Sequence, residues 1–153
     1  MIIPIEVDEG KVYRGARPEH WYDLTRLKTK GIKTILSLEY GFGAWFDGNL
    51  NEEVEWAAGT GIDVLSIRMS DFLPPKHLEL CAALVILTNP SKFPVYVHCY
   101  HGVDRTGFVI AAYRVRVQGW SFEAAYNEMI NLGFHRWAYW WWVHSLKEFL
   151  GAA

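Results

Sequence analysis

The chain has 153 residues, of which 51% are hydrophobic and 21% charged, and its formal net charge at pH 7 is −2. This balance indicates a folded protein, and the length fits one domain, spanning residues 1–153. No apolar run approaches the roughly 18 residues of a membrane span. The slightly acidic charge excludes a general basic surface for nucleic acid or an anionic membrane. Two cysteines, Cys81 and Cys99, are too few for a disulfide scaffold.

Turn signals and apolar periodicity divide the chain into alternating strand-like and helical segments. A hairpin is expected over 2–13, around Asp8-Glu9-Gly10. Further strands are expected over 32–38, 62–68 and 94–98, a loop over 39–49, and helices over 19–30, 51–59, 76–88, 105–118, 121–133 and 137–150. This alternation predicts an α/β fold, in which helices flank a central, mostly parallel sheet.

Three local features complete the predicted fold. Asn51 is expected to cap the helix that follows it, because its side chain can accept a hydrogen bond from the first turn. Cys81 lies in an apolar helix and is interpreted as a buried small hydrophobe. Four tryptophans fall between Trp137 and Trp142. We expect them to be mainly core, with one or two exposed beside a pocket or a self-contact, because six helical positions cannot share one face.

The segment 97–107 reads Val-His-Cys-Tyr-His-Gly-Val-Asp-Arg-Thr-Gly and carries the clearest chemistry. A strand ends at Cys99, five residues turn, and Arg105 opens a helix. Such a turn points backbone N–H groups inward, and the helix N-terminus adds partial positive charge. Gly102 permits a backbone angle that a side chain would obstruct. The guanidinium of Arg105 can hold two phosphate oxygens, and the field favours the nucleophilic thiolate of Cys99.

These residues resemble the signature of the protein tyrosine phosphatase superfamily, His-Cys-x5-Arg-Thr-Gly. The chain length and the segment Val-Tyr-Arg-Gly-Ala-Arg-Pro at 12–18 look like its small dual-specificity-like branch. The resemblance implies a dual-specificity-phosphatase-like fold. It also implies that Cys99 attacks phosphorus to form a cysteinyl-phosphate, while Arg105 and the loop amides bind the phosphate oxygens. By the same resemblance Thr106 hydrogen-bonds the thiolate, and His98 orients the cysteine.

The family chemistry also needs a general acid on a loop before the catalytic strand. Asp71 lies 28 residues before Cys99, after a strand and before two prolines, which fits that role. Its alternative role is to cap the helix after Pro75. Asp104 is the competing acid, because some phosphoinositide phosphatases that this segment resembles also carry Asp-Arg-Thr here. A carboxylate at that place would repel a dianionic substrate, so we favour a structural role for Asp104, with an auxiliary acid role second.

Further substrate contacts are expected on the signature loop and on nearby cationic side chains. The candidates are Tyr100, His101, Gly102, Val103, Asp104, Arg17, Arg68 and Arg136. Arg14 and Arg17 are expected to support the loop or lie at its rim, and each remaining arginine can equally be an ordinary surface charge. The histidines show no metal-ligand spacing, so neither a metal nor a cofactor is expected.

The predicted function is hydrolysis of phosphate monoesters. The expected partner is an inositol polyphosphate, as in phytase-like enzymes, because the loop variant resembles inositide phosphatases and cationic candidates flank it. A phosphoprotein carrying phosphotyrosine is the alternative. More distant alternatives are a sulfurtransferase and an inactive phosphate-binding module. No signal peptide precedes the first strand, so a cytoplasmic location is expected by default, or a periplasmic or secreted one if a signal has been removed. The oligomeric state is left open.

Overall fold

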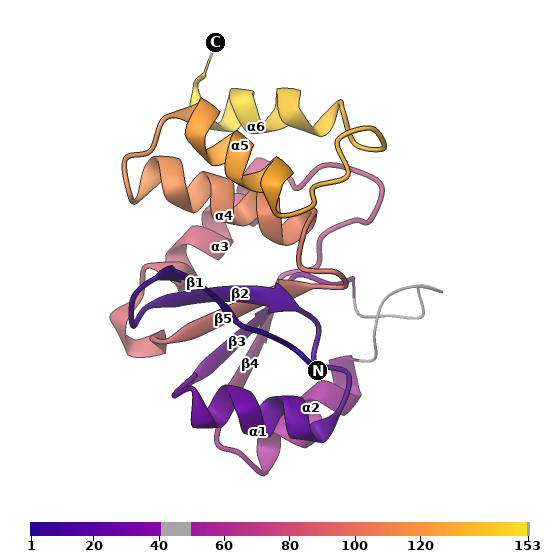
Figure 1. Ribbon diagram of the computed structural model, residues 1–153, viewed down its shortest axis with the longest axis vertical. Helices are drawn as coiled ribbons and strands as arrows, with labels where there is room; N and C mark the ends of the chain where they lie inside the picture. The colour runs from indigo at the N-terminus through magenta and orange to yellow at the C-terminus, as the bar shows by residue number, and fades with distance from the viewer. Residues whose placement is uncertain (41–49, 153) are drawn as a thin grey trace.

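A five-stranded sheet lies at the centre of the computed structural model, which describes residues 1–40 and 50–152 (Figure 1). The strands are β1 (Ile5–Asp8), β2 (Val12–Ala16), β3 (Thr34–Ser37), β4 (Asp63–Ser66) and β5 (Val95–Cys99). Their spatial order is β1-β2-β5-β3-β4. The β1–β2 hairpin is antiparallel, whereas β2, β5, β3 and β4 pair in parallel. The predicted mostly parallel sheet is therefore confirmed.

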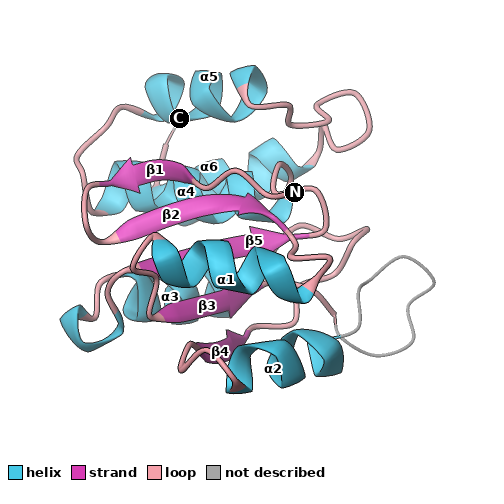
Figure 2. Ribbon diagram, turned by 60° about the horizontal axis from the view of Figure 1, so that its bottom comes forward, coloured by secondary structure: helices cyan, strands magenta, loops and turns pink. Residues whose placement is uncertain are grey.

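Helices cover both faces of the sheet and make this a single α/β domain (Figure 2). One face carries α1 (Trp21–Thr29) and α2 (Leu50–Ala58). The other carries α3 (His77–Leu87), α4 (Arg105–Arg116), α5 (Phe122–Asn131) and α6 (Trp142–Leu150). A short 3-10 turn at Pro90–Lys92 precedes β5. Each face has its own apolar core, which is why the sheet strands are apolar on both sides.

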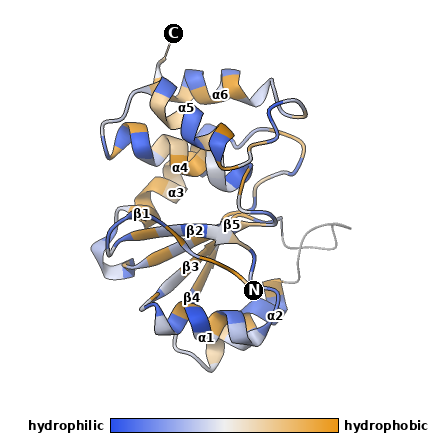
Figure 3. Ribbon diagram, viewed as in Figure 1, coloured by the Kyte–Doolittle hydropathy of each residue, from blue (hydrophilic) through white to orange (hydrophobic). Residues whose placement is uncertain are grey.

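The middle strand β5 positions the segment that carries the chemistry. All five of its residues are buried, and it lies between β2 and β3, with Ala16 opposite Cys99 and Ser37 opposite His98. Figure 3 shows hydrophobic colour concentrated in the sheet and in α3, and more hydrophilic positions on α1. Because parallel strands end at the same edge of a sheet, Cys99 emerges beside the ends of β2 and β3.

Three local expectations are wrong. The last helix begins at Trp142 rather than residue 137, and 135–141 form turns in which Ala138 and Tyr139 donate backbone hydrogen bonds to the carbonyl of His135. Asn51 lies inside α2, which already begins at Leu50. Cys81 is exposed, because it occupies the side of α3 that turns away from the core.

The predicted loop over 39–49 falls mostly on residues 41–49, which lie outside the described residues. The tryptophans also differ from expectation. Only one of the four is core: Trp142 is fully buried, whereas Trp137, Trp140 and Trp141 are exposed. Within residues 1–40 and 50–152, no helix is long and apolar enough to cross a membrane.

Candidate active site

The signature loop runs from Cys99, the last residue of β5, to Arg105, the first residue of α4. Its turn depends on Gly102, which has a φ of +72°. A Cβ atom at this position would collide with the backbone of Gly15 and Ala16 in β2. Glycine is therefore required twice, for the left-handed backbone and for the close approach to the neighbouring strand. This contact fixes the curvature of the loop in front of α4.

A buried cation lies beneath the same turn. The Nη2 of Arg14, on β2, donates to the carbonyl of Gly102 (2.8 Å), and the side chain is only 2% exposed. Burial lowers the pKa of the Arg14 guanidinium from its ordinary value, while Glu128 and Cys99 act in the opposite direction. Arginine still keeps its proton at any physiological pH. Arg14 therefore supports the loop, as expected, and adds positive potential around the cysteine.

His98 is fully buried and lies behind the cysteine rather than facing substrate. Its Nε2 donates to Oε1 of Glu53 on α2 (2.9 Å), and its Nδ1 donates to the carbonyl of Cys99 (3.3 Å). Burial alone would lower the pKa of this imidazole, but the charge and hydrogen bond of Glu53 more than offset it, so the pKa is raised. Both ring nitrogens therefore act as donors, and the imidazolium holds the Cys99 backbone in place.

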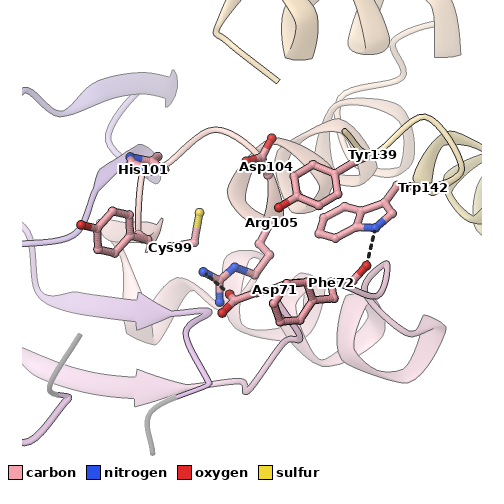
Figure 4. Close-up of a pocket in the computed structure, with 9 residues that line it drawn as sticks. Asp71, Phe72, Cys99, His101, Asp104, Arg105, Tyr139 and Trp142 are labelled. Carbon is pink, nitrogen blue, oxygen red and sulfur yellow. Dashed lines mark hydrogen bonds and ion pairs between the residues drawn. The ribbon is translucent and has the colours of Figure 1, made fainter. Parts of the chain in front are cut away.

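A pocket of about 220 Å³ opens in front of the loop (Figure 4). The Cys99 side chain lies at its floor and is 2% exposed. The lining residues come from the loop, from the segment after β4, from the turns before α6 and from the first residue of α6: Asp71, Phe72, Cys99, Tyr100, His101, Asp104, Arg105, Tyr139 and Trp142. The structure thus brings the predicted nucleophile, arginine and acid together in one pocket.

Arg105 and Asp71 face each other across this pocket. Nη2 of Arg105 lies 2.7 Å from Oδ1 of Asp71, an ion pair drawn as a dashed line in Figure 4. The same guanidinium donates to the carbonyls of Leu38 (3.4 Å) and Met69 (3.3 Å), which lie just after β3 and β4. The guanidinium is therefore oriented by the backbone, and Asp71 occupies the position that an entering anion would share.

Asp104 has a different set of partners. Its Oδ1 accepts from the backbone N–H of His135 (2.9 Å), and its Oδ2 accepts from the Nδ1 of the same residue (2.7 Å). These two bonds tie the signature loop to the segment between α5 and α6. Asp104 lines the pocket, but both carboxylate oxygens are engaged in this tie, which fits the structural role that we favoured.

Other predicted contacts divide between the pocket and its surroundings. Tyr100 and His101 line the pocket, whereas Gly102 and Val103 line a second hollow that Tyr100 and His101 also border. Arg17 lies outside the lining: its guanidinium carbon is 4.4 Å from the ring centre of Tyr100, and its Nη1 is 3.6 Å from Oε1 of Glu39. Arg17 therefore supports the rim through Tyr100.

Arg68 and Arg136 are exposed and are not among the pocket residues. The guanidinium carbon of Arg136 lies 4.9 Å from the ring centre of Trp137. Thr106 is fully buried, and its Oγ1 has no hydrogen-bond partner within the part of the chain that the structure describes. A hydroxyl that is kept available in this way is what a hydrogen bond to the thiolate requires.

Three pocket residues were not among the predicted contacts: Phe72, Tyr139 and Trp142. The Tyr139 hydroxyl points into the pocket (Figure 4). Burial raises the pKa of Tyr139, and the carboxylates of Asp104 and Asp71 add to that increase. Tyr139 is therefore a neutral hydrogen-bond donor at physiological pH. For Tyr139 and Trp142, the tryptophan-rich segment was the only sequence feature that pointed to the pocket. The helix predicted over 137–150 would have oriented their side chains differently.

Comparison with known proteins decides the family. Residues 11–119 match the family described as "Polymorphic toxin system, DSP-PTPase phosphatase". The chain belongs to the DSP-PTPase phosphatases. The matched residues include β2, Asp71 and the whole signature loop. The predicted resemblance to small dual-specificity-like enzymes of the protein tyrosine phosphatase superfamily is thus confirmed.

Two relatives carry different names. The chain is 32% identical over 133 residues to inositol diphosphatase SIW14 of Saccharomyces cerevisiae, covering 82% of this chain and 43% of the yeast protein. It is 54% identical over 130 residues to dual specificity protein phosphatase TpbA of Pseudomonas aeruginosa, covering 80% of this chain and 51% of that protein. This phosphatase chain therefore spans about half the length of the curated relatives it matches.

Solved structures of both relatives share the fold. The core catalytic domain of the PP-IP phosphatase SIW14 from S. cerevisiae, in complex with citrate, superposes with a TM-score of 0.73 at 26% identity, over 89% of this chain and 81% of that chain. P. aeruginosa TpbA superposes with a TM-score of 0.70 at 26% identity, over 94% and 81% of the two chains. The predicted dual-specificity-phosphatase-like fold is confirmed.

Proposed function

We propose that this chain hydrolyses phosphate monoesters through a cysteinyl-phosphate intermediate. The observation that carries the proposal is that Cys99, Arg105 and Asp71 line one pocket. This pocket lies at the N-terminus of α4, where the helix dipole favours an anion. In the first step the Cys99 thiolate attacks phosphorus, the bond from phosphorus to the leaving oxygen breaks, and Asp71 gives its proton to that oxygen. Arg105 and the loop amides bind the three remaining phosphate oxygens.

The second step returns the enzyme to its starting state. Water attacks the phosphorus of the cysteinyl-phosphate, Asp71 takes a proton from that water, and the sulfur–phosphorus bond breaks. The departing sulfur carries the electron pair as a thiolate, which the Thr106 hydroxyl stabilises. Inorganic phosphate leaves, and Asp71 is again protonated. No metal or cofactor is required for this sequence of steps.

The phosphate of the substrate competes with Asp71 for Arg105. The planar guanidinium favours a bidentate contact with two phosphate oxygens. Its pairing with Asp71 at 2.7 Å keeps the arginine extended toward the pocket before substrate enters. Once phosphate occupies the guanidinium, the Asp71 carboxylate loses this cationic partner, takes up a proton from water and can face the leaving oxygen as an acid. One arginine thus serves first to hold the acid and then to hold the substrate.

We propose an inositol polyphosphate as the first candidate for the substrate. The proposal is supported by the similarity to the yeast inositol diphosphatase SIW14 and by the exposed imidazole of His101 at the pocket rim, which can donate a hydrogen bond to a further phosphate. Arg105 is the one arginine or lysine among the pocket residues that the structure describes. The rim therefore suits a substrate whose other phosphates extend into solvent.

Phosphotyrosine is the second candidate, and a separate observation favours it. Four of the described pocket residues are aromatic: Phe72, Tyr100, Tyr139 and Trp142. Aromatic walls bind a flat aryl leaving group through ring contacts. A variant of TpbA, which shares the fold, has been solved in complex with pTyr. The phosphatase family match argues against the sulfurtransferase alternative.

The experiment compares phosphate release at equal concentrations of several substrates. These are inositol hexakisphosphate, lower and pyrophosphorylated inositol phosphates, phosphotyrosine and phosphothreonine peptides, and an aryl phosphate. An inositol phosphate with the highest kcat/KM supports the first candidate. A phosphotyrosine peptide tenfold above every inositol phosphate would replace it with the second. Release from none of them, with vanadate still bound, would identify an inactive phosphate-binding module.

A further inference from the structure

We propose that Trp142 is a positioning residue for acid catalysis, because its indole N–H holds the loop that carries Asp71. The inference rests on the proposed role of Asp71 as proton donor. Nε1 of Trp142 donates to the carbonyl of Phe72, the residue next to Asp71, at 3.2 Å (Figure 4). The two residues are 70 positions apart in the chain. This bond links α6 directly to the segment between β4 and α3.

The indole is itself held rigidly. Trp142 is fully buried. Its ring lies 4.4 Å from that of Tyr139 and makes an edge-on contact with Phe108, at 6.1 Å between ring centres. Phe108 belongs to α4, the helix that begins at Arg105. Trp142 is thus packed against the same helix that presents the phosphate-binding arginine. Its N–H group therefore has a fixed position relative to Arg105.

The tip of the acid loop has little packing of its own. Phe72 and Leu73 are 73% and 62% exposed. Within the loop, the Ser70 hydroxyl accepts hydrogen bonds from the backbone N–H groups of Phe72 and Leu73, both at 3.1 Å. Those bonds shape the turn but do not attach it to the rest of the protein. At the tip of the loop, the Asp71–Arg105 ion pair and the Phe72–Trp142 hydrogen bond reach other elements.

These two contacts differ in what substrate does to them. A phosphate in the pocket takes the guanidinium of Arg105 and so weakens the ion pair with Asp71. The hydrogen bond from Trp142 goes to a backbone carbonyl outside the phosphate site, so substrate leaves it in place. Trp142 therefore holds the acid loop over the pocket at the moment when Asp71 must donate its proton. This effect concerns leaving-group protonation and not phosphate binding.

The test variant is Trp142→Phe, which removes the indole N–H but retains an aromatic ring. The matched control is Trp140→Phe. Trp140 is 71% exposed and is not a pocket residue. Kinetics are measured on an alkyl phosphate, whose leaving oxygen needs a proton, and on 4-nitrophenyl phosphate, which needs little help. We expect Trp142→Phe to lower kcat about five- to tenfold on the alkyl phosphate, the worth of one hydrogen bond, and less than about twofold on the nitrophenyl ester. Trp140→Phe should change neither.

A second variant separates the hydrogen bond from packing. Placing the benzothiophene analogue of tryptophan at position 142 keeps the two-ring shape but lacks the N–H donor. It should reproduce the selective loss on the alkyl phosphate with an unchanged melting temperature. Equal losses on both substrates, for both variants, would show that Trp142 has only a structural role and would overturn the proposal.

The double variant Trp142→Phe with Asp71→Asn tests the route of the effect. If Trp142 acts through Asp71, the double variant is no slower on the alkyl phosphate than Asp71→Asn alone. A further loss by the full factor of Trp142→Phe would overturn the positioning role while leaving the acid in place. An Asp71→Asn variant with normal kcat would instead refute the proposed acid, which is a separate failure.

Discussion

The signature loop and the segment 133–142 meet at the same pocket but are built in opposite ways. The loop carries its chemistry in consecutive residues between β5 and α4, and β2 supports it through the close approach to Gly102 and the hydrogen bond from Arg14. The segment 133–142 forms turns and is held by contacts with distant residues, through His135 to Asp104 and Trp142 to Phe72. The loop thus supplies the nucleophile and the phosphate-binding groups, while the segment 133–142 positions Asp71 and the rim of the pocket.

The largest expected effect comes from removing the nucleophile in the loop. Cys99→Ser should abolish turnover, by on the order of 10⁴-fold or more, because a serine hydroxyl is not ionised at neutral pH. Arg105, Gly102 and the start of α4 remain, so the variant should still fold and bind vanadate. Steady-state kinetics, circular dichroism and vanadate titration check this. Turnover within tenfold of the wild type would contradict the role of Cys99.

The next largest effect concerns the acid at the other side of the pocket. Asp71→Asn keeps the shape but cannot donate a proton, so kcat on an alkyl phosphate should fall by about 10²–10³. The loss should be smaller on an aryl phosphate with a good leaving group. Measuring kcat across a series of leaving groups checks the expectation. An equal loss on all members would mean that Asp71 acts only by orienting Arg105, its 2.7 Å partner.

The same contrast explains what the sequence could predict. The loop chemistry is encoded in consecutive residues, so Cys99, Arg105 and the need for Gly102 could be inferred before the fold was known. The parallel sheet followed from the alternation of segments. Asp71 needed the family resemblance in addition, because an aspartate before two prolines is also an ordinary helix-capping residue.

The parts that could not be predicted depend on contacts between distant residues. Apolar periodicity suggested a helix from residue 137, but the pairing of His135 with Asp104 and the burial of Trp142 determine where α6 begins. Arg17, Arg68 and Arg136 were all candidate substrate contacts in the sequence, yet none of them lines the pocket, and Arg17 lies against the ring of Tyr100 at its rim. Side-chain direction at a rim is set by tertiary packing, which spacing along the chain does not encode.

A third prediction concerns the support behind the loop. His98 has a pKa raised in the folded state by Glu53, so the pair adds stability that is fully present below the unfolded value, about pH 6.5, and is lost as pH rises through the folded pKa. Glu53→Gln should therefore lower the free energy of unfolding by about 1–3 kcal/mol at pH 6, and by less toward pH 9.

Urea unfolding at several pH values measures this difference. Glu52→Gln is the matched control, because Glu52 lies next to Glu53 on α2 but is exposed. The control should change stability by less than about 0.5 kcal/mol at every pH. A Glu53→Gln effect that grows with rising pH would contradict the ionised state of the buried pair. It would indicate that His98 is neutral when the loop is folded.

The smallest expected effect separates the two carboxylates of the pocket. Asp104→Asn keeps an oxygen that can accept from the backbone N–H of His135. It removes the charged carboxylate oxygen that lies 2.7 Å from Nδ1 of His135 in the wild type. We expect a loss of about 1 kcal/mol in unfolding free energy and a change in kcat below about tenfold, because the tie is weakened while the acid remains. His135→Ala should have a similar effect, and the double variant should add little, since both changes remove the same contact.

Kinetics on the alkyl phosphate and thermal unfolding of the three variants test the contact between Asp104 and His135. If Asp104→Asn slows the alkyl phosphate more than Asp71→Asn does, proton donation must be assigned to the loop itself, and the division of labour between loop and rim no longer holds.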